Sequence, residues 1–422
     1  MSEVERLDGA NWHFHSDQPL SFNCRSCRLL DICGGLHVKG PAMDCFRFCC
    51  GKQECDMVCP NSPHHYAKRL QEIRGFGLEN ISRCAPVKFE RISGYAPLIH
   101  HAYSRSSTFP GEIVSLSLYE LLDRDGAPKY FSRSDVARQF RIRSDARLII
   151  TGVDRDALLE RLWRSTHREA IAVMLRSLEV SLVTSPNFSV YNNVPRTENL
   201  YNIKRSALIA QEFLGRRVPV AIHVNACTDT DYLRYSEFLA GRPEFDAISF
   251  EFITGPGFPS RVGWHVKKLI ELSNAVARPL QLVMRGGTST LGLLSAAFPN
   301  IVAVDSDPLQ CALRRKRMIF GNEGRVRYVD NKLPKGEPVD ELLAQNALAA
   351  EAEVEYALRV PQTTKPFAKR SQRKLPDASY ANYKSRQLSL LADASHRKAG
   401  THAVDAERVV TATEPKGTTK IH

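Results

Sequence analysis

The sequence lacks any long apolar stretch. A membrane-spanning helix needs about 20 consecutive apolar residues, and no run of this kind occurs in the 422 residues. The segment from Met1 to Gln18 is polar and charged, so it also lacks the apolar core of a secretory signal peptide. These absences predict no membrane segment and a cytoplasmic protein. In the cytoplasm, clustered cysteines are more often metal ligands than disulfides.

Two further features are scarce or missing. The glycine pair Gly286-Gly287 is not followed by the Gly-Lys-Ser/Thr ending of a Walker A phosphate loop, which excludes that class of nucleotide-binding site. Cysteine is rare along most of the chain, where only Cys84, Cys227 and Cys311 occur. The other eight of the eleven cysteines are concentrated in one block of 36 residues.

This cysteine block extends from residue 24 to residue 59 and needs a cross-link, because so many thiols cannot form an ordinary apolar core. The segment Cys55-Asp56-Met57-Val58-Cys59-Pro60 has the C-x3-C-P ending that is common in iron–sulfur proteins. Cys24 and Cys27 form a C-x2-C knuckle, which is also typical of zinc sites. The block therefore predicts a [4Fe–4S] cluster, with zinc as the alternative. The expected metal ligands are Cys24, Cys27, Cys33, Cys45, Cys49, Cys50, Cys55 and Cys59.

The first part of the block resembles a known iron–sulfur segment. The run from Cys24 to Gly35 reads C-x2-C-x5-C-G-G. It is similar to SPASM-type auxiliary domains of radical S-adenosylmethionine maturases, and it departs from them at Leu36, where that family often has another cysteine. The resemblance implies a [4Fe–4S] cluster. The C-x3-C-x2-C motif of the radical enzymes themselves is absent, because Ser62 stands where the third cysteine would be.

The charge balance is basic. The formal net charge is +12 and the isoelectric point is about 9.2. Residues 361–422 alone contain twelve Lys or Arg and only five Asp or Glu, in a Ser-, Thr- and Ala-rich segment with little periodicity. This composition predicts a disordered basic tail. An excess of positive charge favours an anionic partner, so we expect a nucleotide or nucleic acid.

Residues 95–330 show alternating short β-branched runs and helical stretches, as in successive βα units. Eight such units predict a (β/α)8 barrel, with an open doubly wound sheet as the alternative. The expected strands are Pro97–His101, Ile113–Leu118, Leu148–Gly152, Val180–Thr184, Val218–Val224, Ala247–Phe252, Leu280–Met284 and Ile301–Val304. The expected helices are Ala157–Ser165, Arg168–Ser177, Asn199–Phe213, Asp231–Ala240, Gly263–Ala277, Ser289–Ala297 and Pro308–Phe320.

Two flanking segments complete the predicted organisation. Residues 1–74 combine the cysteine block with a basic linker helix at 65–74. A Pro/Gly-rich break at 333–338 precedes an Ala-, Leu- and Glu-rich segment, residues 339–360, whose strong helix formers predict one helix.

Polar residues follow most of the expected strands, where the functional groups of barrels collect. Those singled out by type are His100, His101, Tyr103, Arg105, Asp154, Asn187, His223, Asn225, Glu251, Asp305 and Asp307. We expect His223, Glu251 and Asp305 to be catalytic, with the carboxylates as base or nucleophile and the histidine as acid. Asp305 and Asp307 share one side of a strand end, where they can hold a divalent cation or cap the next helix.

The segment after the seventh strand predicts an anion site. Arg285 supplies a bidentate donor, and Gly286 and Gly287 allow backbone N–H groups to approach a phosphate. Thr288 and Ser289 would begin a helix, whose N-terminus also favours anions. The alternative is a tight turn with hydroxyl caps.

Residues 185–255 resemble a poorly characterised family from phages and mobile elements. The shared segments are Pro186-Asn187-Phe188-Ser189-Val190-Tyr191, the pair Tyr201-Asn202 and the strand Pro219–Val224. The resemblance implies a barrel-like fold but no reaction. A more distant similarity is to queuine-type transglycosylases, whose C-x-C-x2-C zinc motif is missing here.

The sequence therefore predicts an enzyme acting on a nucleotide or nucleic acid by base or glycosyl transfer or by hydrolysis. The alternative is a non-enzymatic nucleic-acid-binding or redox-sensing iron–sulfur protein.

Overall fold

The structure, a computed structural model, describes residues 69–102, 104–190 and 196–359. The predictions for the cysteine block, for Tyr103 and for the basic tail at 361–422 lie outside these residues. Of the predicted linker helix, the described part is helical at residues 69–73.

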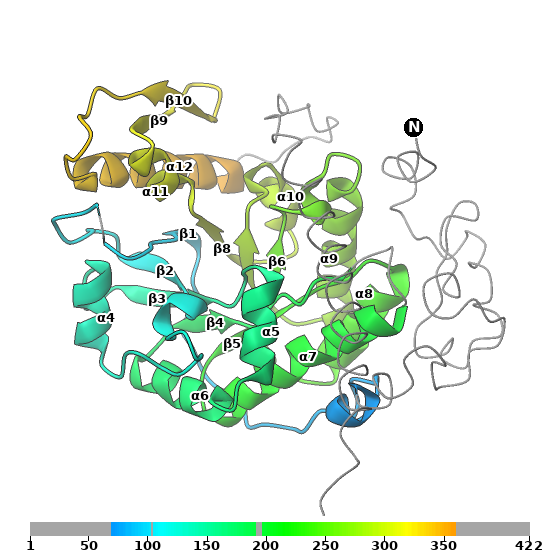
Figure 1. Cartoon of the computed structure of the whole chain (residues 1–422). Coiled ribbons are helices and arrows are strands. Elements are labelled where there is room, and N and C mark those ends of the chain that lie inside the picture. Colours follow the sequence, from blue (N-terminus) through cyan, green and yellow to red (C-terminus); the bar gives the residue numbers. More distant parts are fainter. Residues whose placement is uncertain (1–68, 103, 191–195, 360–422) are drawn as a thin grey trace, which may run out of the picture. The chain divides into compact units, whose positions relative to one another are not determined.

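Eight parallel strands form a barrel with helices between them (Figure 1). The strands are β1 (Gly94–Pro97), β2 (Ile113–Ser117), β3 (Arg147–Thr151), β4 (Leu182–Thr184), β5 (Val220–His223), β6 (Ala247–Glu251), β7 (Gln281–Arg285) and β8 (Asn300–Asp305). Each strand pairs with the next from β2 to β8, and β8 pairs with β1. The ring closes where Leu98 bridges to Ser115 and the N–H of Ile99 donates to the carbonyl of Ser115 at 2.8 Å. This order confirms the (β/α)8 prediction and excludes the open doubly wound sheet.

Seven α-helices follow the strands within the barrel. They are α4 (Arg133–Phe140), α5 (Asp156–Arg164), α6 (Arg168–Ser177), α7 (Arg196–Gly215), α8 (Asp229–Ala240), α9 (Val262–Val276) and α10 (Leu291–Leu294). Short 3₁₀ turns are η3 (Leu118–Leu121), η4 (Gly255–Gly257) and η5 (Thr288–Thr290). Local sequence fixes several helix starts, as in α8, where Thr228 and Asp231 form a reciprocal capping box. None of the described helices has the length and apolarity needed to cross a membrane.

A second layer covers the strands β1 and β8 (Figure 1). It consists of α11 (Asp307–Leu313), the hairpin β9 (Lys316–Phe320) with β10 (Val326–Asp330), and α12 (Asp340–Arg359). The buried side chain of Asn346 on α12 accepts from Met318 N at 2.7 Å and donates to Lys316 O at 3.0 Å. The helix predicted at 339–360 is therefore present, and it holds the hairpin in place.

Three predicted elements differ from the structure. The first strand begins at Gly94 instead of Pro97, so that Ala96 and Leu98 enter the barrel core. The helix expected at 308–320 stops at Leu313, because Arg315 adopts a left-handed φ of 56° and the chain then pairs as β9. The helix expected at 289–297 is shortened to η5 and α10.

The barrel interior contains a buried apolar cluster. The buried cluster there consists of Ile92, Ala96, Leu98, Ile149, Leu182, Ala221, Ala247, Val283, Val302 and Val304. Since alternate residues of a strand face the same side, these positions identify which side chains point inward along each strand. Two residues further along several strands, the inward positions become polar.

Candidate active site at the barrel mouth

The carboxyl ends of the strands form a polar layer inside the barrel, which we call the mouth. Its inward-facing residues continue the alternation set by the apolar cluster below. They are Ser117 on β2, Thr151 on β3, Thr184 on β4, His223 on β5, Ser249 and Glu251 on β6, and Arg285 on β7. Active sites of (β/α)8 barrels lie at this end of the strands.

Glu251 is the buried carboxyl group of the mouth. Its exposed fraction is 8%, and Oε2 accepts a 2.9 Å hydrogen bond from Asn187 Nδ2. Burial raises the pKa of Glu251, while the positive charge of Arg285 and the Asn187 hydrogen bond act in the opposite direction. A carboxyl group with a raised pKa can hold a proton closer to neutral pH and so can act as an acid.

A second carboxyl group, Asp154, is connected to Glu251 through the same asparagine. The backbone N–H of Asp154 donates to Asn187 Oδ1 at 3.3 Å, and Ser117 Oγ donates to Asp154 Oδ2 at 3.4 Å. The negative charge of Asp154 adds to the rise in the Glu251 pKa. The Asn187 side chain thus fixes the relative position of two loops and orients the Glu251 carboxyl.

Arg285 spans the mouth. It leaves β7, and its Nη1 donates to the carbonyl of Val153, after β3, at 3.2 Å. In a ring of eight strands these two lie on opposite sides, so the guanidinium crosses the barrel axis. Its Nε is buried and has no hydrogen-bond partner among the described residues. A partly unsatisfied guanidinium is suited to bind an anionic group of a ligand.

His223 lies at the level of Ser249, one step deeper in the mouth than Glu251, and is 2% exposed. Its Nδ1 is 3.1 Å from Ser249 Oγ, and its backbone N–H donates to Ser185 Oγ at 2.8 Å. Burial and then the charge of Arg285 lower the pKa of His223 to about 3. The ring is therefore neutral near pH 7 and carries no proton to donate as an imidazolium. This geometry favours a structural role over the predicted role as catalytic acid.

Asp305 does not join the other predicted catalytic residues. Val302 and Val304 of β8 face the interior, so Asp305 faces outward, toward the layer that carries α12. Its Oδ1 accepts from the backbone N–H of Asp307 at 2.9 Å at the start of α11, as a capping group does. Burial and then the charge of Asp307 raise the pKa of Asp305 to about 7. The expected common mouth of His223, Glu251 and Asp305 therefore contains only the first two.

The predicted anion loop is a tightly packed turn. Gly286 and Gly287 have φ values of 70° and 71°, which favour glycine. A Cβ on Gly287 would approach the Phe252 ring to 2.8 Å. Packing against Phe252 and Ile253, which follow β6, thus explains both glycines. Thr288 belongs to η5 and Ser289 is exposed, while α10 behind them has only four residues, so phosphate binding by this loop stays a prediction.

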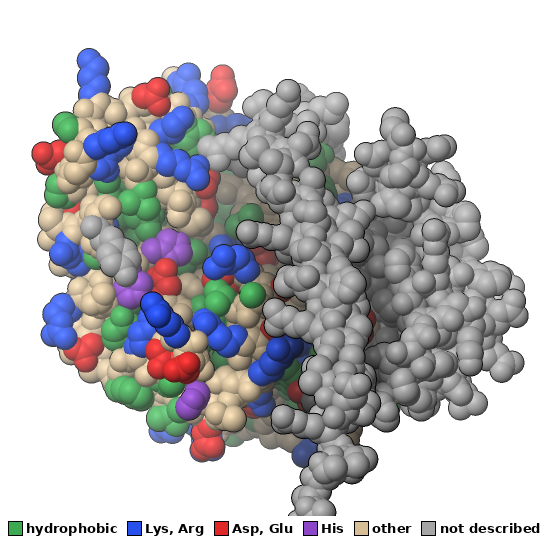
Figure 2. Space-filling model, in the orientation of Figure 1, with side chains coloured by type: hydrophobic (Ala, Val, Ile, Leu, Met, Phe, Trp, Pro, Cys, Tyr) green, Lys and Arg blue, Asp and Glu red, His purple; other side chains and the backbone are tan. Residues whose placement is uncertain are grey.

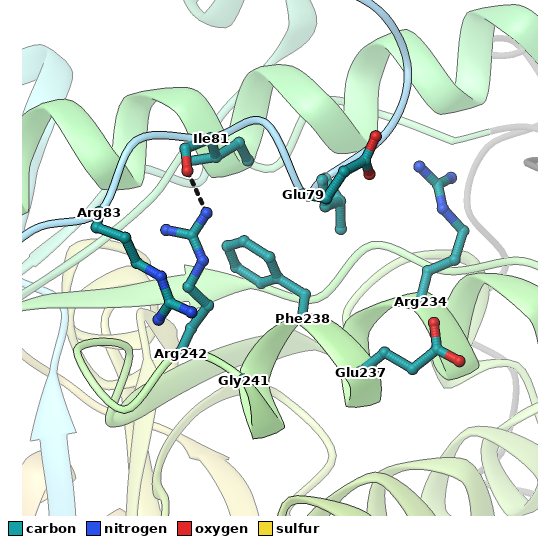
Figure 3. Close-up of a pocket in the computed structure, with 9 residues that line it drawn as sticks. Glu79, Ile81, Arg83, Arg234, Glu237, Phe238, Gly241 and Arg242 are labelled. Carbon is teal, nitrogen blue, oxygen red and sulfur yellow. Dashed lines mark hydrogen bonds between the residues drawn. The ribbon is translucent and has the colours of Figure 1, made fainter.

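A separate groove of about 350 Å³ lies away from the mouth, between residues 78–83 and the C-terminal half of α8 (Figure 3). Two arginines of its lining, Arg242 and Arg83, are engaged within the fold. Arg242 donates to the carbonyls of Ile81 and Ser82 and pairs with Glu244 at 3.2 Å, and Arg83 also contacts Glu244. These contacts therefore attach residues 78–83, which precede β1, to the barrel. On the side drawn in Figure 2, Lys and Arg side chains are interspersed with Asp and Glu.

Four residues near the mouth form pairs that the sequence analysis did not predict, and one of them, Glu120, was not singled out there at all. These are His100, Glu120, Asp154 and Asn187, and spacing alone did not show that they pair. Within the described ranges, no group of three or more His, Cys, Asp or Glu side chains is arranged to hold a metal ion, so the cation suggested for Asp305 and Asp307 has no such site there. No protein-family model matches this chain, and no curated protein matches it.

Proposed function

We propose that the protein is an enzyme that acts on an anionic, nucleotide-class substrate at the barrel mouth. The reaction is hydrolysis of a bond of this substrate or transfer of its base or glycosyl group. The observation that carries this proposal is the buried Glu251 carboxyl, held by Asn187 beside Arg285 at the carboxyl ends of the strands. The net charge of +12 and the unpaired Nε of Arg285 support an anionic substrate.

The residues suggest a division of roles for base release or exchange. Arg285 binds an anionic group of the substrate, which places the scissile bond near β6. Glu251 in its protonated form gives its proton to the leaving nitrogen as the carbon–nitrogen bond breaks. Asn187 holds the Glu251 carboxyl in one orientation, and Asp154 opposes its early ionisation.

The cysteine block stays a separate proposal. We propose that its eight cysteines hold a [4Fe–4S] cluster, or zinc in the alternative, that supports the fold or transfers electrons. No step at the mouth depends on it.

The test uses the full-length protein with nucleoside 5′-monophosphates, single- and double-stranded DNA, and RNA. Mass spectrometry of the released bases measures turnover. We expect Glu251→Gln to lower kcat by roughly 100- to 10,000-fold, because general acid catalysis contributes about that factor. Binding of the same substrate should change little, since the amide keeps the side-chain shape.

The exposed Glu323→Gln variant, in the turn between β9 and β10, is the matched control and should keep full activity. Equal rates for Glu251→Gln and the wild type would contradict the assignment. Tight nucleic-acid binding without any turnover would instead support the non-enzymatic alternative.

A further inference from the structure

A histidine–carboxylate pair lies on the opposite side of the mouth from Glu251. His100 follows β1 and Glu120 lies in η3, directly after β2. Their side chains meet with 2.7 Å between His100 Nδ1 and Glu120 Oε1, and they are 33% and 27% exposed. In the ring order, β2 stands across the barrel from β6, which carries Glu251.

The position of His100 follows the alternation of its chain segment. Ala96 and Leu98 belong to the interior cluster, so His100, two residues later, points to the same side and reaches the mouth. The segment is anchored there, because Leu98 N donates to Asp305 O and Ile99 N donates to Ser115 O, each at 2.8 Å. The imidazole is thus held on rigid backbone at the rim of the interior.

The pairing determines which ring nitrogen is free. An ionised carboxylate only accepts hydrogen bonds, so His100 Nδ1 must carry the hydrogen. The other nitrogen, Nε2, then presents a lone pair. The second oxygen of Glu120 is buried and has no hydrogen-bond partner among the described residues, while Lys129 Nζ reaches only the Glu120 carbonyl, at 3.0 Å. The carboxylate therefore acts mainly on His100.

We propose that His100 is the catalytic base of the mouth and that Glu120 is its positioning residue. This inference rests on the proposed function and completes its acid–base chemistry. His100 Nε2 takes a proton from water or from an incoming base. The atom that loses this proton, either the water oxygen or a nitrogen of the incoming base, forms a bond to the substrate carbon while the carbon–nitrogen bond breaks. The leaving nitrogen takes the proton of Glu251, and solvent then returns both groups to their starting states.

The two mouth histidines differ in the access that this role requires. His223 is 2% exposed and lies deeper in the mouth than Glu251, where its Nδ1 contacts Ser249 Oγ. His100 is partly exposed at the rim, with a carboxylate behind it, as in other histidine bases oriented by an acidic residue. The geometry therefore assigns proton transfer to His100.

The first test does not depend on a substrate. The protein has 13 histidines, so ¹⁵N-histidine NMR of the full chain can assign His100 by the loss of its signals in His100→Gln. At about pH 8 the wild type should show a protonated Nδ1 and an unprotonated Nε2. In Glu120→Ala the tautomer should shift toward protonated Nε2. A merely structural contact of Glu120 with its surroundings would leave the tautomer unchanged.

The second test uses the substrate panel of the proposed function. We expect His100→Gln to lower kcat for base release by about 100-fold or more, with KM changed by less than about threefold. The control is His101→Gln, because His101 stacks on Phe140 with 4.5 Å between ring centroids and is not part of the pair. This control should retain wild-type turnover.

The outcomes separate the two ideas. A wild-type protein that releases no base from the panel defeats the proposed function. An unprotonated Nδ1 in the wild type defeats the dyad, whether or not turnover is seen. Equal kcat for His100→Gln and His101→Gln also overturns the role of His100 as base.

Discussion

The mouth and the outer layer beneath α12 lie on opposite faces of the barrel wall, and each receives a carboxyl group from the end of a strand. Glu251 faces the interior from the end of β6, whereas Asp305 faces outward from the end of β8. Both carboxyl groups have raised pKa values because of burial. Only the first lies beside a guanidinium, that of Arg285, whose Nε has no hydrogen-bond partner among the described residues. Because a shift of one residue along a strand moves a side chain to the other face, strand register decides whether a terminal carboxyl group is a candidate catalytic acid or a cap for the next helix.

The largest effect should come from removing the cation that spans the mouth. Arg285→Gln should lower kcat/KM for the substrates of the panel by about 100-fold or more, since the guanidinium is expected to contact substrate charge. Steady-state kinetics measures this loss. Arg317→Gln on β9, in the outer layer, is the matched control and should leave kcat/KM unchanged. Similar losses in both variants would remove the distinction between the two regions.

The next effect concerns stability in acid. The folded-state pKa of His223 is lowered to about 3, so the folded protein binds fewer protons than the unfolded chain between about pH 3 and pH 6.5. Stability from this site is present above about pH 6.5 and is lost as the pH falls. Between pH 7 and pH 4.5 this site should cost the wild type about 3 kcal/mol of unfolding free energy, and His223→Gln should not show this loss.

Urea unfolding at the two pH values measures the His223 effect. The exposed His167→Gln variant is the control and should keep the wild-type pH dependence. If His223→Gln loses as much stability in acid as the wild type, the histidine is not buried in its neutral form.

The smallest effect has the opposite sign and comes from the outer layer. The pKa of Asp305 is raised to about 7, so the folded protein binds more protons than the unfolded chain between about pH 4 and pH 7. Stability from this site is full at low pH and is lost as the pH rises. From pH 5 to pH 8 the free energy of unfolding of the wild type should therefore fall by about 1–2 kcal/mol more than that of Asp305→Asn.

Thermal or urea unfolding across this range tests the Asp305 prediction. The mouth kinetics should be unchanged in Asp305→Asn, because the side chain faces away from the interior. A loss of turnover comparable to that of Glu251→Gln would show that the two faces are not functionally separate.

The sequence predicted the barrel because its strands are short, β-branched and separated by helical stretches. It missed α4, although Ser132 and Asp135 form a recognisable start, in which the serine side chain accepts from Asp135 N. It extended the helix at 308–320, because the left-handed residue at Arg315 and the contacts of Asn346 are tertiary features. Periodicity alone could not anticipate them.

The candidate site was only partly predictable for a related reason. Polar residues after strands were visible in the sequence, but their orientation depends on the register of each strand. Glu251 and Arg285 fell on the interior side, and Asp305 fell outside. The partners of Glu251 and His100 come from other loops, Asn187 from the segment after β4 and Glu120 from η3. Such pairings arise only when the ring is closed.

The closure of the barrel has a mechanical consequence. The other neighbouring strands share two or more paired positions, whereas the described contact of β1 with β2 is the single bridge of Leu98 and Ser115. His100 and Glu120 stand on either side of this seam, two residues beyond Leu98 and five beyond Ser115. Any force that parts the seam also separates the imidazole from its carboxylate. The proposed pairing of His100 with Glu120 therefore depends on closure of the ring between β1 and β2.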